Sequence, residues 1–91
     1  MFTQIPIKLK KLKKKNLDKE ILRVGIIAEL DAINLYEQMA GITQNRKIKK
    51  ILLDVAKEEK THVGEFQSLL LKEDKEQTEE LEAGRKEVMK K

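Results

Sequence analysis

Cysteine and tryptophan are absent from this 91-residue chain, and proline occurs once. Without cysteine there is no disulfide, no thiolate zinc site and no iron–sulfur cluster. Long apolar runs are also absent, since a membrane span needs about 18 or more apolar residues in a row. The first residues lack the uninterrupted apolar core of a secretory signal. We therefore expect a cytoplasmic protein that does not cross a membrane.

Acidic side chains are missing from the first fifteen residues, which carry six lysines. The whole chain has 20 Lys and Arg and 16 Asp and Glu, so residues 16–91 hold 14 basic and 16 acidic side chains. We divide the chain into a basic arm, residues 1–16, and one helical domain, residues 17–91. A basic arm can meet a polyanion. This one has no arginine for bidentate phosphate contacts, which favours a loosely held terminus over nucleic-acid binding.

Charged residues make up 40% of the chain while Gly and Pro are sparse, a composition typical of helical proteins. Hydrophobic residues recur in steps of four and three along two long stretches, which predicts two amphipathic helices. The first is expected to run from an N-cap at Asn16 to Ala40, with Gly41 ending it. The second is expected to begin at a cap supplied by Thr43 or Asn45 and to end near residue 71. The short connection makes them antiparallel neighbours.

A third, shorter helix is expected over residues 75–90, with Asp74 as its N-cap and Gln77 in the capping-box position. Two long helices in so small a chain cannot enclose a core by themselves. A two-fold dimer is the commonest symmetric way to cover them. The predicted fold is therefore all-α: an antiparallel two-helix hairpin with a short C-terminal helix, which completes a four-helix bundle by dimerisation.

Three polar side chains occupy apolar rows: Glu29 in the first helix, and Glu59 and His62 one turn apart in the second. A buried carboxylate is costly unless something pairs with it, and a metal ion is a common partner of such a pair. At about 1.5 Å per residue the three lie at similar distances from the connecting loop, so they can converge. Two chains would supply four Glu and two His, the set found in di-iron carboxylate bundles. Such ligands suit iron or manganese, and also zinc.

Two segments carry a resemblance: AELDAINLYEQ at residues 28–38 and EEKTH at residues 58–62. Together they resemble the encapsulated ferritin family, half-length ferritin-like proteins that work inside encapsulin shells, and especially its archaeal form, in which this domain precedes the shell protein. The resemblance covers about residues 18–88. It implies a ferritin-like bundle and a ferroxidase, with two iron ions per dimer held by Glu29, Glu59 and His62. It also implies that Tyr36 lies beside this centre.

The resemblance further implies that dimers assemble into an open, ring-like decamer inside an encapsulin nanocompartment, and that iron passes to the surrounding shell. Members often carry acids one residue before and two residues after the first ligand. This chain has Ala28 and Asp31 there, so Asp31 is a candidate auxiliary metal ligand without the usual second acid. The usual C-terminal docking peptide is not visible in the last residues, EVMKK.

Other functions stay open on the residues alone. One alternative is a non-enzymatic dimerisation module whose Lys-rich arm binds nucleic acid or an anionic surface. Another keeps the metal but gives it a structural role in the dimer, or uses it to reduce peroxide.

Overall fold

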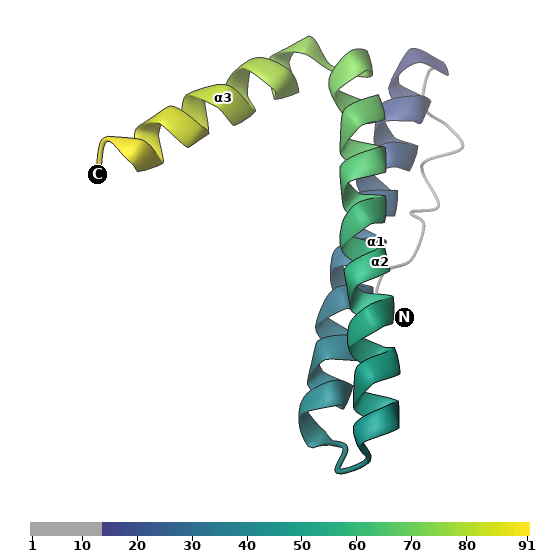
Figure 1. The fold of residues 1–91 in the computed structure, drawn as a ribbon. Helices are drawn as coiled ribbons and strands as arrows, with labels where there is room; N and C mark the ends of the chain where they lie inside the picture. The colour runs from purple at the N-terminus through teal and green to yellow at the C-terminus, as the bar shows by residue number, and fades with distance from the viewer. Residues whose placement is uncertain (1–13) are drawn as a thin grey trace.

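The computed structural model describes residues 14–91 and consists of three helices: α1 (Lys14–Ile42), α2 (Arg46–Glu73) and α3 (Lys75–Met89). α1 and α2 form an antiparallel hairpin, and α3 turns away from it at the end of α2 (Figure 1). No strand occurs within residues 14–91. The predicted all-α hairpin with a C-terminal helix is therefore confirmed. Most of the predicted basic arm lies outside the described residues.

Both predicted ends of the first helix are wrong. α1 already begins at Lys14, so Asn16 lies inside the helix and does not cap it. At the other end, Gly41 continues the helix, because the described glycines all have negative φ and the backbone N–H of Thr43 still donates to the carbonyl of Met39 at 3.1 Å. A glycine ends a helix only when it adopts the left-handed conformation, and here it does not.

The cap of α2 is Asn45. Its side-chain Oδ1 accepts hydrogen bonds from the backbone N–H groups of Lys47 at 2.9 Å and Ile48 at 3.0 Å, which satisfies two donors that a helix start leaves open. Of the two candidates, Thr43 instead supports the cap, because its Oγ1 accepts from the N–H of Asn45 at 3.2 Å. α2 then continues to Glu73, slightly beyond its predicted end.

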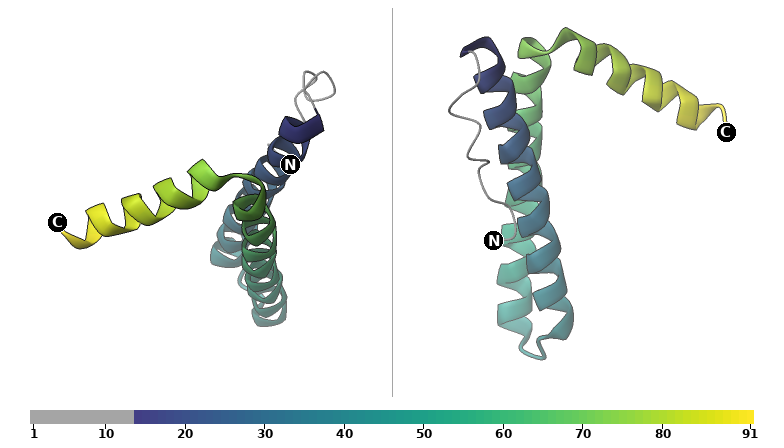
Figure 2. Two further views of the ribbon diagram at one scale, coloured as in Figure 1. Left: turned by 90° about the horizontal axis from the view of Figure 1, so that it is seen from above. Right: turned by 180° about the vertical axis from the view of Figure 1, so that it is seen from behind.

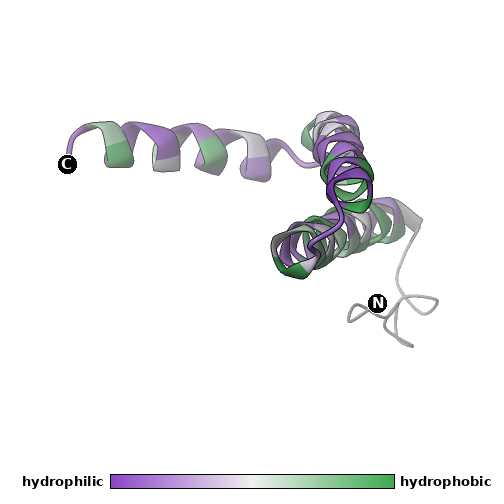
Figure 3. Ribbon diagram, turned by 60° about the horizontal axis from the view of Figure 1, so that its bottom comes forward, coloured by the Kyte–Doolittle hydropathy of each residue, from purple (hydrophilic) through white to green (hydrophobic). Residues whose placement is uncertain are grey.

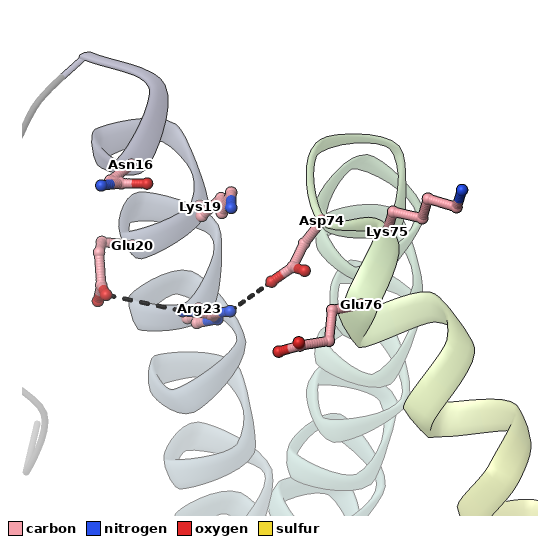
Figure 4. Close-up of a pocket in the computed structure, with 7 residues that line it drawn as sticks. All are labelled: Asn16, Lys19, Glu20, Arg23, Asp74, Lys75 and Glu76. Atoms are coloured by element: carbon pink, nitrogen blue, oxygen red, sulfur yellow. Dashed lines mark hydrogen bonds and ion pairs between the residues drawn. The ribbon is translucent and has the colours of Figure 1, made fainter.

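Asp74 joins α2 to α3 and ties both to α1. Its Oδ1 accepts the backbone N–H of Gln77 at 3.0 Å, which confirms the predicted N-cap of α3. Its Oδ2 accepts a hydrogen bond from the Arg23 guanidinium of α1 (Figure 4), a partner that the sequence did not predict. The N–H of Gln77, followed by the positive charges of Lys19 and Arg23, lowers the pKa of Asp74. The interaction sits in a polar depression of about 520 Å³.

The hairpin encloses very little core. Within residues 16–91 the buried hydrophobic residues are Ile33, Ala40, Ala56 and Leu70. The radius of gyration is 16.3 Å, against about 12 Å for a compact domain of this length. Figure 2 shows the reason: α3 projects to one side of the hairpin and leaves its faces open. Figure 3 shows that α3 is mostly hydrophilic, whereas both hairpin helices carry hydrophobic residues along much of their length.

One face of α2 carries uncovered apolar side chains, with the exposed Glu58 and Glu65 between them. Its residues recur in steps of three, four and seven, so they lie in one row along the helix. Ile48 is 51% exposed, Ile51 61% and Leu69 51%, and Val55 and His62 are half-buried in the same row. We call this row the α2 stripe: Ile48, Ile51, Val55, His62 and Leu69. No helix within residues 14–91 is long and apolar enough to cross a membrane.

Candidate metal centre

Glu29 of α1 meets Glu59 and His62 of α2 in the middle of the hairpin. Each can offer one ligand atom such that all three atoms lie within 4.8 Å of one another. His62 Nδ1 lies 3.2 Å from Glu29 Oε2 and 3.6 Å from Glu59 Oε1. The three side chains that were predicted to converge therefore do so. The reason is the one expected: in an antiparallel hairpin, residues at equal distances from the loop lie side by side.

The cluster is open on one side. The side chains of Glu29 and Glu59 are 18% and 19% exposed, whereas that of His62 is 44% exposed. The carboxylates thus lie between the two helices, and the imidazole lies at the edge of their contact, on the α2 stripe. The cluster is therefore sheltered at its carboxylates and open to solvent at its imidazole.

The pKa values of Glu59 and His62 are both raised. Hydrogen bonding with Glu29 raises the pKa of Glu59, and burial and the negative charge of Glu29 act in the same direction. Hydrogen bonding with Glu29 also raises the pKa of His62, which the charges of Glu29 and Glu59 support. Both shifts reflect the negative charge gathered in the cluster, and burial adds to the shift of Glu59 but opposes that of His62. A divalent cation would neutralise this charge, and two carboxylates with one imidazole are a donor set that fits iron, manganese or zinc.

Tyr36 and Asp31 are not part of this cluster. Tyr36 is on α1, seven residues after Glu29, which places it about 10 Å further along the helix axis. Asp31 is only two residues from Glu29, but residues two apart on a helix do not face the same way. Their predicted roles, beside the centre and as an auxiliary ligand, remain predictions.

Sequence reasoning missed two interhelical contacts near the centre. Lys60 Nζ lies 2.8 Å from Glu37 Oε2 and links α2 to α1 at the surface. Gly25 of α1 lies against the ring of Phe66 of α2. The second contact had a visible signal, because Gly25 is one helical turn from Glu29 and Phe66 is one turn from His62.

A hairpin with a Glu on one helix and a Glu-x-x-His on the other is half of a di-iron-type bundle, so fold and site together define a ferritin-like helical protein. The chain belongs to the rubrerythrin family, whose sequence profile matches residues 20–91. It is 58% identical to the encapsulated ferritin domain from Pyrococcus furiosus, whose crystal structure superposes with a TM-score of 0.84 over 87% of this chain and 81% of that one. The predicted resemblance to encapsulated ferritins is thereby confirmed.

Two proteins with similar sequences are associated with encapsulins by name. The chain is 65% identical over 69 residues to a ferritin-like–encapsulin shell fusion protein of Pyrococcus furiosus, a match that covers 76% of this chain and 20% of that protein. It is 45% identical over 56 residues to an encapsulin nanocompartment cargo protein of Myxococcus xanthus, covering 62% of this chain and 43% of that protein. The matches thus span about a fifth of the first relative's length and less than half of the second's.

Proposed function

We propose that this chain is a ferroxidase subunit: two copies join their hairpins, and iron(II) is oxidised by dioxygen between them. The observation that carries the proposal is the position of His62. It is a ligand of the cluster and also a member of the exposed α2 stripe, so a second hairpin that covers the stripe also closes the open side of the cluster. The dimer would then hold four carboxylates and two imidazoles around two iron ions.

Each residue has a defined task in this proposal. Glu29 and Glu59 neutralise the positive charge of the substrate iron and hold it between the helices, and His62 supplies a nitrogen donor from the edge. All three must lose their protons to bind. A pair of bound iron(II) ions would give dioxygen two electrons, one from each ion, which reduces it to the level of peroxide. On the family resemblance alone, we propose a place beside the assembled centre for Tyr36 and an auxiliary role in guiding iron for Asp31.

The likeness to a shell fusion and to a cargo protein supports a location inside an encapsulin nanocompartment. The resemblance to encapsulated ferritins implies an open assembly that does not store mineral itself. We therefore propose that the dimers form a ring-like decamer that passes oxidised iron to an encapsulin shell for storage.

The test is aerobic addition of iron(II) to the purified chain. Ferric absorbance should develop faster than in buffer, and metal analysis should find about one iron per chain. Glu59→Gln and His62→Ala should each weaken metal binding more than about 100-fold, beyond the loss typical of an outer-sphere partner. Glu80→Gln is the control, because Glu80 is an exposed carboxylate on α3 that lies outside both the cluster and the α2 stripe.

Other outcomes would assign one of the alternatives. Zinc retained without any iron oxidation would make the metal a structural link in the dimer. Salt-sensitive DNA binding in the absence of metal would make the chain a binding module instead.

A further inference from the structure

Gly25 allows the two hairpin helices to approach closely. A Cβ atom placed on Gly25 would lie 3.3 Å from both Cδ2 and Cε2 of Phe66 and 3.6 Å from its Cγ. Carbon atoms in contact normally lie about 3.5 to 4.0 Å apart, so the Phe66 ring rests on the bare backbone of α1. The other three glycines, Gly41, Gly64 and Gly84, have no atom within 4 Å of such a Cβ. Among the glycines of the described residues, only Gly25 lies where a side chain would press against another residue.

This contact lies one helical turn from the metal cluster on both helices. Gly25 is four residues before Glu29 on α1, and Phe66 is four residues after His62 on α2. Because the helices are antiparallel, the Gly25–Phe66 pair and the Glu29–His62 pair occupy successive levels, about 6 Å apart along the axis. A helix is stiff over one turn, so the spacing of the helices at Gly25 sets their spacing at the ligands.

We propose that Gly25 is a positioning residue for the metal centre. Its missing side chain lets Phe66 hold α1 and α2 close enough for the Glu29 ligand atom to reach those of Glu59 and His62. Gly25 itself touches no metal. The proposal rests on the proposed function, which requires that ligands from both helices bind the same ions.

A contact that served packing alone would behave differently. Alanine favours a helix more than glycine does, and a displacement of Phe66 by a few tenths of an ångström need not destabilise an open hairpin. Gly25→Ala should therefore leave the thermal stability of the metal-free protein unchanged or higher. The same displacement widens the site, and a metal site is sensitive to such distances. Stability and metal affinity should therefore change in opposite directions.

The experiment is a Co²⁺ titration of the full chain, followed by visible absorption, which reports ligand geometry. Gly25→Ala should weaken Co²⁺ binding about 10-fold and alter the spectrum of the bound ion. Gly64→Ala is the matched control: it brings the same gain in helix propensity two residues from His62, where a Cβ meets open space, and should leave affinity and spectrum unchanged. In a Phe66→Leu background, where the ring carbons are gone, Gly25→Ala should lower the Co²⁺ affinity by less than about twofold.

The proposal is overturned if Gly25→Ala binds Co²⁺ as Gly64→Ala does, or if its cost is as large in the Phe66→Leu background as in the wild type. It is also overturned if affinity and metal-free stability fall together. Failure of the proposed function gives a different result, because the unmodified chain would then bind no Co²⁺ at all, or would bind it equally well after His62→Ala.

Discussion

Glu29 is the residue on which the cluster depends most. It is the only member of the cluster from α1, and it is the first cause of the raised pKa values of both Glu59 and His62. Glu59 and His62 share one helix and would stay neighbours in any arrangement of the hairpin. The convergence of charge is therefore a property of the tertiary fold. It can be tested in the metal-free protein by measuring a pKa in the cluster.

The pKa of His62 should lie above its ordinary value of 6.5 in the metal-free protein. His62 is the only histidine, so an NMR titration of its ring protons measures this value without assignment. A raised pKa means that the contact with Glu29 stabilises the fold fully below pH 6.5 and that this contribution is lost as pH rises through the folded-state pKa. In Glu29→Gln the pKa should move back toward 6.5. An equal pKa in both proteins would show that Glu29 does not face the imidazole in solution.

The ligand residues could be predicted because they interrupt apolar rows, and because the rise of a helix converts sequence distance into height. The same reasoning could not find Arg23 as the partner of Asp74. That contact depends on how far the two helices have rotated by the end of the hairpin, and periodicity does not give this rotation. The roles of Tyr36 and Asp31 follow from family resemblance, and helix periodicity does not predict how far either side chain lies from the cluster.

At the level of the helices, the two caps were predictable and the ends of α1 were not. Asn45 and Asp74 each precede a helix and carry a short side chain that accepts backbone N–H groups, so local sequence is enough. Gly41 looked like a helix end, but a glycine has no fixed conformation of its own. Here the hydrogen bond from Thr43 to Met39 carries the helix past it.

Asp74→Ala should destabilise the chain more than Asn45→Ala, because Asp74 both caps α3 and binds Arg23. Loss of a cap alone should lower the midpoint of thermal unfolding by about 5 °C. Asp74→Asn separates the two effects: asparagine still caps, but it cannot form the ion pair. Circular dichroism of the three variants measures the order of the midpoints. If Asp74→Ala melts no earlier than Asn45→Ala, the contact with Arg23 contributes nothing.

Protonation of Asp74 should also lower the stability of the chain in acid. The pKa of Asp74 is lowered from its ordinary value of 3.8, so its contribution is present above pH 3.8 and is lost as pH falls through the lower folded-state value. The wild type should therefore lose stability in this acidic range more steeply than Asp74→Asn, in thermal melts repeated at decreasing pH. Parallel curves for the two proteins would contradict this.

At the level of the whole molecule, the described chain leaves much of its apolar surface uncovered. The hairpin buries few residues, α3 approaches only α2 within the described chain, and the α2 stripe stays uncovered. A second hairpin on that stripe would bury its isoleucines and leucine, and would surround the six ligands with apolar side chains. Dimerisation and metal binding would then be linked, because the metal binds only the assembled site.

Metal should therefore promote dimerisation, and a change on the α2 stripe should weaken both. Leu69 is 51% exposed and lies two turns from His62 on this row, so Leu69→Lys removes nothing from the core of a single chain. It should raise the dimer dissociation constant at least about tenfold, the equivalent of losing one buried leucine, and weaken metal binding in parallel. Leu53→Lys is the control, since Leu53 is 44% exposed on the opposite side of α2. Sedimentation with and without a chelator measures the linkage: if the wild type sediments equally in both, the metal does not lie between two chains.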